Sequence, residues 1–501
     1  MSVGNSNLIR IFSNYFGKIW NFLSIFLLTP VYIYYLDIDS YAVIAFYTLI
    51  ISIITLADAG VASAVTREFS LNNGKDYKYN ILKKIEKIYW LIFLLIGIII
   101  AINSTKIVEV YLKTNEIDEG YLSNCVMLIA IGASIQLISS IYFGALFGVG
   151  RQVSANIIQI IWTTSKSLMV IPLFIFYESS LYVFFIWQIV CNIFYVIFLR
   201  YVVFKEIKPK LEMSSNIKIP KEMIRYIGGM FLISMFSALN MQADKIIVSY
   251  YFSLKEFGQY WIASYLSQLC IFIGVPMAAF LFPILSKYHN DQNGIKKIFI
   301  KYTNLLYYVI FPLSVLIFLY SGEILNIWMS HLGKDIISNE MPFLVKCLSI
   351  GSLFFAMQMP FYYTLLAKAQ TKYIVYQNIF QMIVGVSLLI YFSNYKGFVS
   401  LGIPWLVVNL IGFIYLIFIT FKKFIQINIG KYLLICVVGP LFISILLGSG
   451  GWFIYKMIGL NFLYISVPFL IGSFFSIVAI MKFKEKSILL KTKSLLDFPK
   501  D

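Results

Sequence analysis

The sequence predicts an all-α polytopic membrane protein, and two observations indicate that fold class. The 501-residue chain is 60% hydrophobic and 13% charged, with a mean hydropathy of +0.84, whereas soluble domains are about 45–50% apolar and about 25% charged. Its apolar residues form near-continuous runs of about 20 residues, the length of a membrane-spanning helix, and do not alternate like the strands of a β-barrel. These features exclude a soluble enzyme, a disordered protein and a nucleic-acid-binding protein.

Hydropathy windows of about 19 residues predict about 14 transmembrane helices. In chain order, the predicted spans are 15–35, 41–64, 88–103, 122–148, 155–177, 181–203, 226–251, 258–284, 303–321, 342–367, 373–392, 400–421, 432–455 and 460–481. The longest connections, 65–87, 204–225 and 322–341, are too short for a folded extramembrane domain.

The positive charges alternate along the chain as this set of spans requires, because cytoplasmic loops retain Lys and Arg. With the N-terminus inside, the inner segments carry most of the lysines and arginines, and the tail from Lys482 is basic. The outer loops are acidic and hold few basic residues: Lys106, Lys113, Lys255, Lys334, Lys396 and Lys456. Both termini are therefore predicted to be cytoplasmic, and the net charge of +17 mainly reflects topology and anionic headgroups.

A weak internal similarity divides the chain into halves. The segments ALFGVGRQVSANIIQIIW (Ala145 to Trp162) and TLLAKAQTKYIVYQNIFQMI (Thr364 to Ile383) both predict a helix, a tight basic turn and a second helix that carries Asn and Gln. Their offset of about 220 residues is close to six spans, which gives the two copies the same orientation. The predicted organisation is a six-helix lobe over 1–203, a cytoplasmic linker at 204–225, a second six-helix lobe over 226–421 and a terminal helix pair with a basic tail over 422–501.

Five charged residues lie inside the predicted spans, where each costs about 2.5–3.5 kcal/mol at a helix centre and normally faces a bundle interior or water. They are Asp58, Lys166, Asp244, Lys245 and Lys346. Adjacent residues on a helix point about 100° apart, so Asp244 and Lys245 are not expected to neutralise each other. Three lysines against two carboxylates predict a cationic interior.

A cationic cavity suits an anionic substrate such as a diphosphate. Lys166, Lys245 and Lys346 are therefore candidate substrate-binding residues, and Arg67 and Arg151 would add to a cytoplasmic mouth. The competing interpretations are buried ion pairs, lysines that reach the interface and arginines that only anchor the topology.

Two further functional roles are predicted for residues within the spans. Asp58 or Asp244 is a candidate for binding a coupling ion, H⁺ or Na⁺, since the chain has no nucleotide-binding motif. Pro276 and Pro283 bracket VPMAAFLFP and are candidate hinge residues, because proline permits a kink in a membrane helix. A static kink would explain the two prolines equally well.

The sequence contains no motif of an enzyme or a metal centre. It has no P-loop, GxSxG or HExxH motif and no carboxylate pair in a plausible reactive loop, so we expect no catalytic residue. The two histidines, His289 and His331, are far apart, and the five cysteines lie singly in apolar segments. Neither pattern predicts a metal site or a disulfide.

Two motifs resemble those of the polysaccharide flippases in the multidrug/oligosaccharidyl-lipid/polysaccharide exporter superfamily, which is MATE-like and includes O-antigen flippases. LADAGVASAVTREFS (Leu56 to Ser70) is similar to the second-helix stretch of the family, with its D-x-G and following Arg. LNMQADKIIVSYYFSLKEFGQYWIASYLSQL (Leu239 to Leu269) resembles its seventh and eighth helices, with an intramembrane Asp and a later G-x-Y. One departure is the first outer loop, YYLDIDSYAVIAF (Tyr34 to Phe46), where family members often have glycines.

The resemblance implies a carrier in the bacterial cytoplasmic membrane. Such a carrier moves an undecaprenyl-diphosphate-linked oligosaccharide from the inner to the outer leaflet by alternating access, for O-antigen, capsule or exopolysaccharide assembly. It would work alongside a polysaccharide polymerase and glycosyltransferases, and no nucleic-acid partner is expected. Physical chemistry agrees, because a diphosphate and sugar hydroxyls would lose their water in hydrocarbon.

Three competing functions are also compatible with a polytopic membrane protein. A lipid II flippase for peptidoglycan would move the same carrier lipid, usually with more cationic residues in its first two helices than the Lys18 and Arg67 present here. A multidrug/cation antiporter would need an acidic lumen, which the intramembrane lysines disfavour. A polysaccharide polymerase or glycosyltransferase would have a large outer loop.

Overall fold

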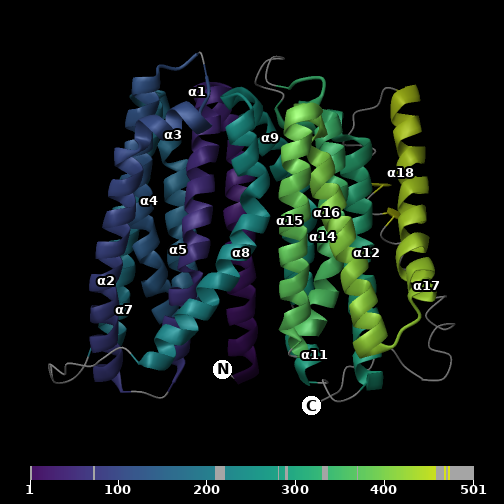
Figure 1. Ribbon diagram of the computed structural model, residues 1–501, viewed down its shortest axis with the longest axis horizontal. Helices are drawn as coiled ribbons and strands as arrows, with labels where there is room; N and C mark the ends of the chain where they lie inside the picture. Colours follow the sequence, from purple (N-terminus) through teal and green to yellow (C-terminus); the bar gives the residue numbers. More distant parts are fainter. Residues whose placement is uncertain are drawn as a thin grey trace. The chain divides into compact units, whose positions relative to one another are not determined.

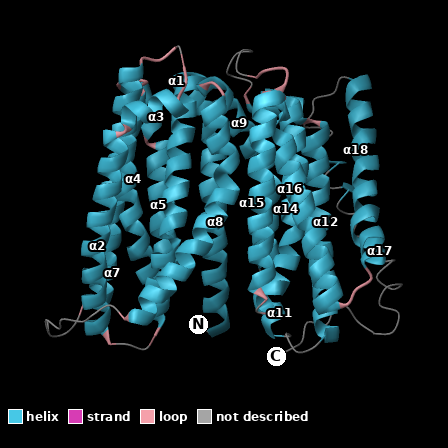
Figure 2. Cartoon of the chain, in the orientation of Figure 1, coloured by secondary structure: helices cyan, strands magenta, loops and turns pink. Residues whose placement is uncertain are grey.

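Every regular element that the structure describes is helical, as the sequence predicts (Figure 2). In this computed structural model the described residues are 3–71, 74–114, 116–208, 220–279, 281–287, 292–329, 337–368, 370–458, 468–469 and 472–473. Within these ranges, 11 helices are long and apolar enough to cross a membrane. The chain is thus a multi-pass helical membrane protein.

The predicted count of about 14 spans differs from these 11 at three places. The first two predicted spans lie in one helical run, α1 (Val3–Ser70), which bends at Asp37. The seventh coincides with α8 (Lys221–Tyr251), which is not among the 11. The last, 460–481, lies almost wholly outside the described residues, as do residues 209–219 of the linker at 204–225 and the tail lysines.

The chain divides into two compact units. Unit 1 comprises Met1–Leu266, Trp328–Leu344 and Asn378–Pro404. Its main elements, which run alongside one another (Figure 1), are α1, α2 (Lys75–Ile102), α3 (Ser104–Tyr111), α4 (Glu119–Gly148), α5 (Gln152–Leu168), α6 (Val170–Phe176), α7 (Leu181–Ile207), α8, α9 (Leu254–Ser267) and the 3₁₀ turn η1 (Phe398–Leu401).

Unit 2 comprises Ser267–Ile327, Val345–Gln377 and Trp405–Asp501. The helices of unit 2 are α10 (Leu269–Ala279), α11 (Leu281–Lys287), α12 (Gln292–Leu319), α13 (Ser321–Trp328), α14 (Met341–Ala367), α15 (Thr371–Tyr395), α16 (Gly402–Ile419), η2 (Thr420–Ile425), α17 (Ile429–Tyr432), η3 (Leu433–Val438) and α18 (Gly439–Ile458). Most of α15, from Asn378 on, and the first residues of α14 and α16 belong to unit 1. The predicted lobe boundaries stay a prediction.

Helix boundaries correct the predicted connections. The predicted loop 65–87 is mostly helical, because α2 begins at Lys75. The connections after the third and ninth predicted spans contain α3 and α13, and the eighth predicted span, 258–284, is broken into α9, α10 and α11. Both segments of the internal similarity are helix–turn–helix units as predicted, α4–α5 and α14–α15.

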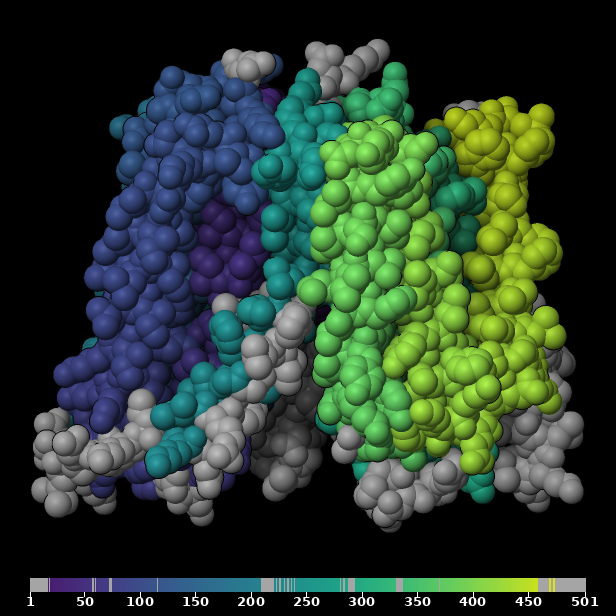
Figure 3. Space-filling view, in the orientation of Figure 1, coloured from purple at the N-terminus to yellow at the C-terminus, as the bar shows by residue number. Residues whose placement is uncertain are grey.

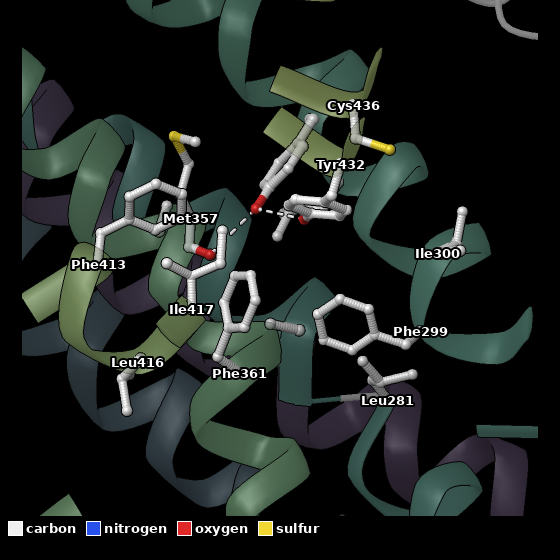
Figure 4. Close-up of a cluster of buried hydrophobic side chains, with 14 of the residues drawn as sticks. Leu281, Phe299, Ile300, Met357, Phe361, Phe413, Leu416, Ile417, Tyr432 and Cys436 are labelled. Atoms are coloured by element: carbon white, nitrogen blue, oxygen red, sulfur yellow. Dashed lines mark hydrogen bonds between the residues drawn. The ribbon is translucent and has the colours of Figure 1, made fainter. Parts of the chain in front are cut away.

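Each unit has its own apolar core. In unit 2, the rings of Phe299 in α12 and Phe361 in α14 lie together in an apolar cluster (Figure 4). The ring centroid of Phe361 lies 5.1 Å from that of Phe299 and 5.3 Å from that of Phe421 in η2. In unit 1, a second cluster joins α1, α2, α4 and α7 around Tyr142 and Leu199. Because lipid tails are as apolar as these side chains, the cores are stabilised mainly by van der Waals packing between the helices.

Other apolar side chains point away from these cores. Leu91, Leu94 and Ile99 of α2 and Phe442 and Phe453 of α18 are all more than half exposed. Figure 3 shows the side chains of α2 and of α18 at the surface of their units. Such contiguous exposed apolar side chains are rare on soluble monomers. On a membrane-spanning helix they form the surface that faces lipid.

Candidate functional site

Lys166 lies in unit 1 beside a break in a candidate span. The span covers Gln152–Phe176, but its helix is interrupted at Met169, so that α6 follows α5. Pro172, in the first turn of α6, lacks the N–H that would bond to the carbonyl of Leu168, and a proline ring clashes with the carbonyl at that position. The proline therefore accounts for a helix break just after Lys166.

Side chains from other helices bond to the backbone carbonyls before this break. An unbonded carbonyl would be costly at membrane depth, and these bonds tie α5 to α1 and α7. The hydroxyl of Tyr32 donates to the carbonyl of Ser167 (2.8 Å), the amide of Gln188 to that of Lys166 (3.1 Å) and the indole of Trp187 to that of Ser165 (3.2 Å).

The ammonium group of Lys166 rests on aromatic rings. Its Nζ lies 4.5 Å from the ring centroid of Trp162 and 5.8 Å from that of Tyr47. The indole of Trp162 is held in turn, because it stacks on Tyr195 with centroids 4.4 Å apart and donates to Asn192 Oδ1 at 3.2 Å. Such cation–π contacts contribute about 0.5–2 kcal/mol, so the rings position the cation.

Among the residues that the structure describes, no acid forms an ion pair with Lys166. The side chain is half-buried, and the faces of the two rings only partly offset its charge. A lysine in this setting is available to bind an anion. We refer to Lys166, Trp162, Tyr47, Asn192 and Gln188 as the Lys166 site.

The expectation that Asp244 and Lys245 do not neutralise each other is wrong. Lys245 Nζ lies 3.1 Å from Asp244 Oδ2 and 3.2 Å from Oδ1, and both residues are buried. The angle of about 100° between neighbours fixes only where each side chain leaves the helix. The flexible four-carbon stem of lysine brings its ammonium group back to the carboxylate, so Lys245 is not an uncompensated cation.

The same pair involves the G-x-Y motif. Tyr260 donates to Asp244 Oδ2 at 2.9 Å, which gives the carboxylate two partners. Gly258 permits close packing of α9 on α1, because a Cβ there would lie 3.2 Å from the carbonyl oxygen of Ile38. The motif therefore has a packing role in unit 1.

Asp58 is buried between α1 and α2. Its Oδ1 accepts a short hydrogen bond from Tyr89, while Oδ2 makes none of ordinary geometry, although Ser140 lies beside the carboxylate. In the same D-x-G motif, a Cβ at Gly60 would lie 2.9 Å from the carbonyl oxygen of Ile227 in α8. The motif thus combines a close helix contact with a buried carboxylate.

The remaining predicted cations have different surroundings from Lys166. Lys346, near the start of α14 in unit 2, is half-buried, with Nζ 5.7 Å from the ring centroid of Phe318. Arg151, at the N-cap of α5, is exposed and lies 3.3 Å from Glu206. Arg67 is exposed in the last turn of α1.

The predicted hinge residues lie in different helices. Pro276 lies in α10, which ends at Ala279, and Pro283 lies in α11, which begins at Leu281. Proline interrupts helical hydrogen bonding, which agrees with the breaks in this segment. Whether the segment bends during transport stays a prediction.

Sequence reasoning missed a chain of buried amides in unit 2. Gln377 Nε2 donates to Gln358 Oε1 at 2.7 Å, and Gln358 Nε2 donates to Asn409 Oδ1 at 3.2 Å. Asn409 Nδ2 then donates to the carbonyl of Trp405 at 2.8 Å. These hydrogen-bonded amides join α15, α14 and α16. The sequence signal that could have indicated them is the presence of Asn and Gln inside apolar runs.

With this geometry in place, comparison with known proteins identifies the family. The family model described as "Polysaccharide biosynthesis protein" matches residues 35–337. The chain belongs to this family. No curated protein sequence matches it.

Solved structures show the fold of this polysaccharide biosynthesis protein. A structure described as lipid II flippase MurJ in an inward closed conformation has a TM-score of 0.72 at 16% identity and covers 96% of this chain and 100% of its own. An inward-facing multidrug resistance MATE family transporter of the MOP superfamily has a TM-score of 0.65 at 15% identity, with coverages of 83% and 94%. The chain therefore has a MATE-like fold.

A third structure is a MOP superfamily transporter from Pyrococcus furiosus whose binding pocket is described as reversed in polarity. Its TM-score is 0.60 at 15% identity, and it covers 84% of this chain and 100% of its own. All three neighbours are flippases or transporters by description. At 15–16% identity these structures show the fold of the chain, and the family model adds its membership of a polysaccharide biosynthesis family.

Proposed function

We propose that this protein is a flippase for an undecaprenyl-diphosphate-linked oligosaccharide in the bacterial cytoplasmic membrane. It moves the repeat unit from the inner to the outer leaflet by alternating access, for assembly of O-antigen, capsule or exopolysaccharide. Membership of a polysaccharide biosynthesis family and the fold of MurJ support a lipid-linked cargo. The observation that carries the proposal is Lys166, a cation inside a candidate span that rests on aromatic rings.

Lys166 suits the diphosphate of the cargo. A diphosphate requires positive charge and hydrogen-bond donors in place of water, and Lys166 offers an ammonium group that no described acid pairs with. Lys346 would provide a second cation in unit 2, and Arg67 and Arg151 would attract the headgroup from the cytoplasm. Lys245 is unsuited to this role, because Asp244 already pairs with it.

Asp58 is our candidate for the coupling ion, H⁺ or Na⁺. Its carboxylate is buried, and one of its oxygens, Oδ2, makes no hydrogen bond of ordinary geometry. This oxygen is therefore an acceptor for a proton or for an ion. Asp244 is the weaker candidate, since Lys245 and Tyr260 already bond to both of its oxygens. Transport by the Asp58→Asn variant should no longer depend on the ion gradient, and undiminished dependence would exclude this role.

A lipid II flippase is the second candidate, and the MurJ structure, which covers 96% of the chain, favours it over an antiporter or a polymerase. A multidrug/cation antiporter is disfavoured, because Lys166 places a positive charge without a described ion pair inside a candidate span. The experiment that separates these functions is depletion of the protein from its host. We expect an undecaprenyl-linked oligosaccharide to accumulate on the cytoplasmic leaflet and the surface polysaccharide to disappear.

Two outcomes of the depletion would contradict the proposal. Accumulation of lipid II with loss of peptidoglycan would identify the peptidoglycan function, and drug sensitivity without any lipid-linked glycan would identify an antiporter. Polymerase and glycosyltransferase genes beside its own would agree with the proposed partners. Plasmid-borne wild-type protein serves as the control, because it should clear the accumulated lipid.

A further inference from the structure

A pocket of about 570 Å³ lies within unit 1, away from the Lys166 site. Three segments form it: the bend of α1, α3 with the turn that follows it, and the connection from α8 to α9, which lie at the same end of unit 1 (Figure 1). Its size is that of a small-molecule site. The lining residues are Asp39, Val108, Glu109, Leu112, Lys113, Thr114, Glu116, Glu119, Tyr251, Phe252, Ser253 and Lys255.

The bend of α1 places Asp39 in this pocket. Asp37 has φ 69° and ψ 176°, a conformation that glycine favours and that strains other residues. Its Oδ1 accepts from the backbone N–H of Ser40 at 2.8 Å and so caps the helix that restarts there. Asp39 therefore lies in the first turn after the bend, at the point where family members often have glycines.

The carboxylate of Asp39 is buried and lacks a partner. Only 6% of the residue is exposed, and among the described residues it makes no hydrogen bond or ion pair. The charges of Glu116, Asp37 and Lys255 act on it only through space. A buried carboxylate normally has partners, and this one lines an open pocket, so it has an acceptor to offer a ligand.

The mouth of the pocket carries charges of both signs. Glu109, Glu116 and Glu119 are exposed there, and so are Lys113 and Lys255. Contacts between the segments hold the mouth together: the N–H of Leu254 donates to the carbonyl of Lys113 at 2.8 Å, and Lys113 Nζ donates to the carbonyl of Tyr250. The walls also include apolar and aromatic side chains, Val108, Leu112, Tyr251 and Phe252.

The chemistry of the lining selects among possible ligands. A phosphate is unsuited, because it only accepts hydrogen bonds and is negative, while four carboxylates line the pocket against two lysines. A metal ion is unsuited, since no group of three potential ligand residues occurs in the described part of the chain. A simple organic cation has no hydrogen-bond acceptor to offer the two lysines. Sugar hydroxyls both donate and accept, which matches carboxylates and ammonium groups together.

We propose that this pocket binds the saccharide portion of the cargo at the outer side of the membrane. Asp39 accepts from the sugar hydroxyls or from an amino group, Lys113 and Lys255 donate at the mouth, and Tyr251 and Phe252 cover the apolar face of a ring. The placement outside follows from the predicted topology, in which all three segments are outer connections. The inference rests on the proposed flippase function and adds a second site, which recognises sugar where the Lys166 site recognises diphosphate.

Binding of lipid-free glycan by the purified full chain in nanodiscs tests the proposal. The probe is the oligosaccharide released by mild acid from the lipid-linked glycan of the host, titrated by calorimetry. Because a hydrogen bond to a charged group is strong, Asp39→Asn should weaken binding about 10-fold or more. Lys255→Met, at the exposed mouth, should weaken it less, and it keeps the test valid if the Asp39 variant unfolds.

Glu178→Gln is the matched control, because Glu178 is an exposed acid in another predicted outer connection and does not line the pocket; this variant should bind as the wild type does. The inference is overturned if the wild type does not bind the oligosaccharide, or if Asp39→Asn and Lys255→Met both bind it as tightly as the wild type does. Displacement of the oligosaccharide by tetraethylammonium or calcium would also overturn it. Depletion of the protein distinguishes failure of this inference from failure of the proposed function. If lipid-linked glycan accumulates on depletion while the pocket variants bind the oligosaccharide normally, the flippase function holds and the pocket is not its sugar site.

Discussion

Lys166 and Lys245 are both lysines of unit 1 within predicted membrane spans, yet they have opposite surroundings. Lys245 is buried with Nζ 3.1 Å from the carboxylate of Asp244, while Lys166 rests on the rings of Trp162 and Tyr47 without a described acid. The charge of Lys245 is neutralised by the adjacent Asp244, whereas the charge of Lys166 is not neutralised by a described acid. A buried lysine thus indicates a binding site only when its partners are known.

The comparison separates a structural charge from a functional one. A buried ion pair mainly fixes how helices pack and is costly to break on one side. A cation that contacts only aromatic rings contributes less to folding stability. Because no acid holds it, its ammonium group can bind an anionic ligand. Substitutions at the two lysines should therefore affect different properties.

The largest effect is expected for Asp244→Asn. It leaves Lys245 buried without its carboxylate, which costs about 3–5 kcal/mol of unfolding free energy. Titration with SDS of the purified protein measures the change. The double variant Asp244→Asn/Lys245→Met should recover most of the loss, and a single variant as stable as the wild type would show that the pair has no structural role.

Next in size is Lys166→Met. Loss of one charge-assisted contact with a phosphate costs about 1.5–3 kcal/mol, so the rate of flipping in proteoliposomes should fall about 10-fold to 100-fold. Stability should stay the same or rise, because an unpaired charge has been removed. Lys166→Arg should retain part of the activity, and unchanged transport by Lys166→Met would refute the assignment of this residue to the cargo.

A smaller loss should follow Trp162→Leu. This change removes the ring beneath the ammonium group, which contributes about 0.5–2 kcal/mol, and transport should fall about 2-fold to 30-fold. Trp162→Phe keeps a ring face but loses the bond to Asn192, so its activity should lie between those of Trp162→Leu and the wild type. Equal activity of the two variants would mean that the ring does not position Lys166.

The smallest effect should belong to Arg151→Gln. Its ion pair with Glu206 is exposed, and such pairs contribute about 0–1 kcal/mol, so stability should change little. If Arg151 only anchors the topology, transport changes less than about 5-fold. A loss as large as that of Lys166→Met would instead assign Arg151 to the cargo path.

The helical class and the position of Lys166 could be predicted from the sequence, because both depend on what lies along one apolar run. The pairing of Lys245 could not be predicted, since a helical projection describes backbone directions and omits the reach of a flexible side chain. The predicted loop before Tyr89 was too long, because the polar first turns of α2 lowered the hydropathy of a continuous helix.

The pocket around Asp39 and the amide chain at Gln358 depend on contacts between distant segments. Asp39 was visible only as one acid in an outer connection, and nothing along the chain indicated that residues 37–40, 108–119 and 251–255 meet. The local signal available was the DIDS sequence, Asp37 to Ser40, which combines a capping residue with the end of an apolar run.

The helix break after Lys166 also limits how this protein can move. Tyr32 and Gln188 reach from α1 and α7 to carbonyls at the end of α5, and each carbonyl stranded in hydrocarbon would cost about 1–3 kcal/mol. Separation of α5 from either neighbour would incur that cost in every transport cycle. We therefore expect α1, α5 and α7 to move as one rigid body during transport, and Lys166 to move together with the aromatic rings that contact it.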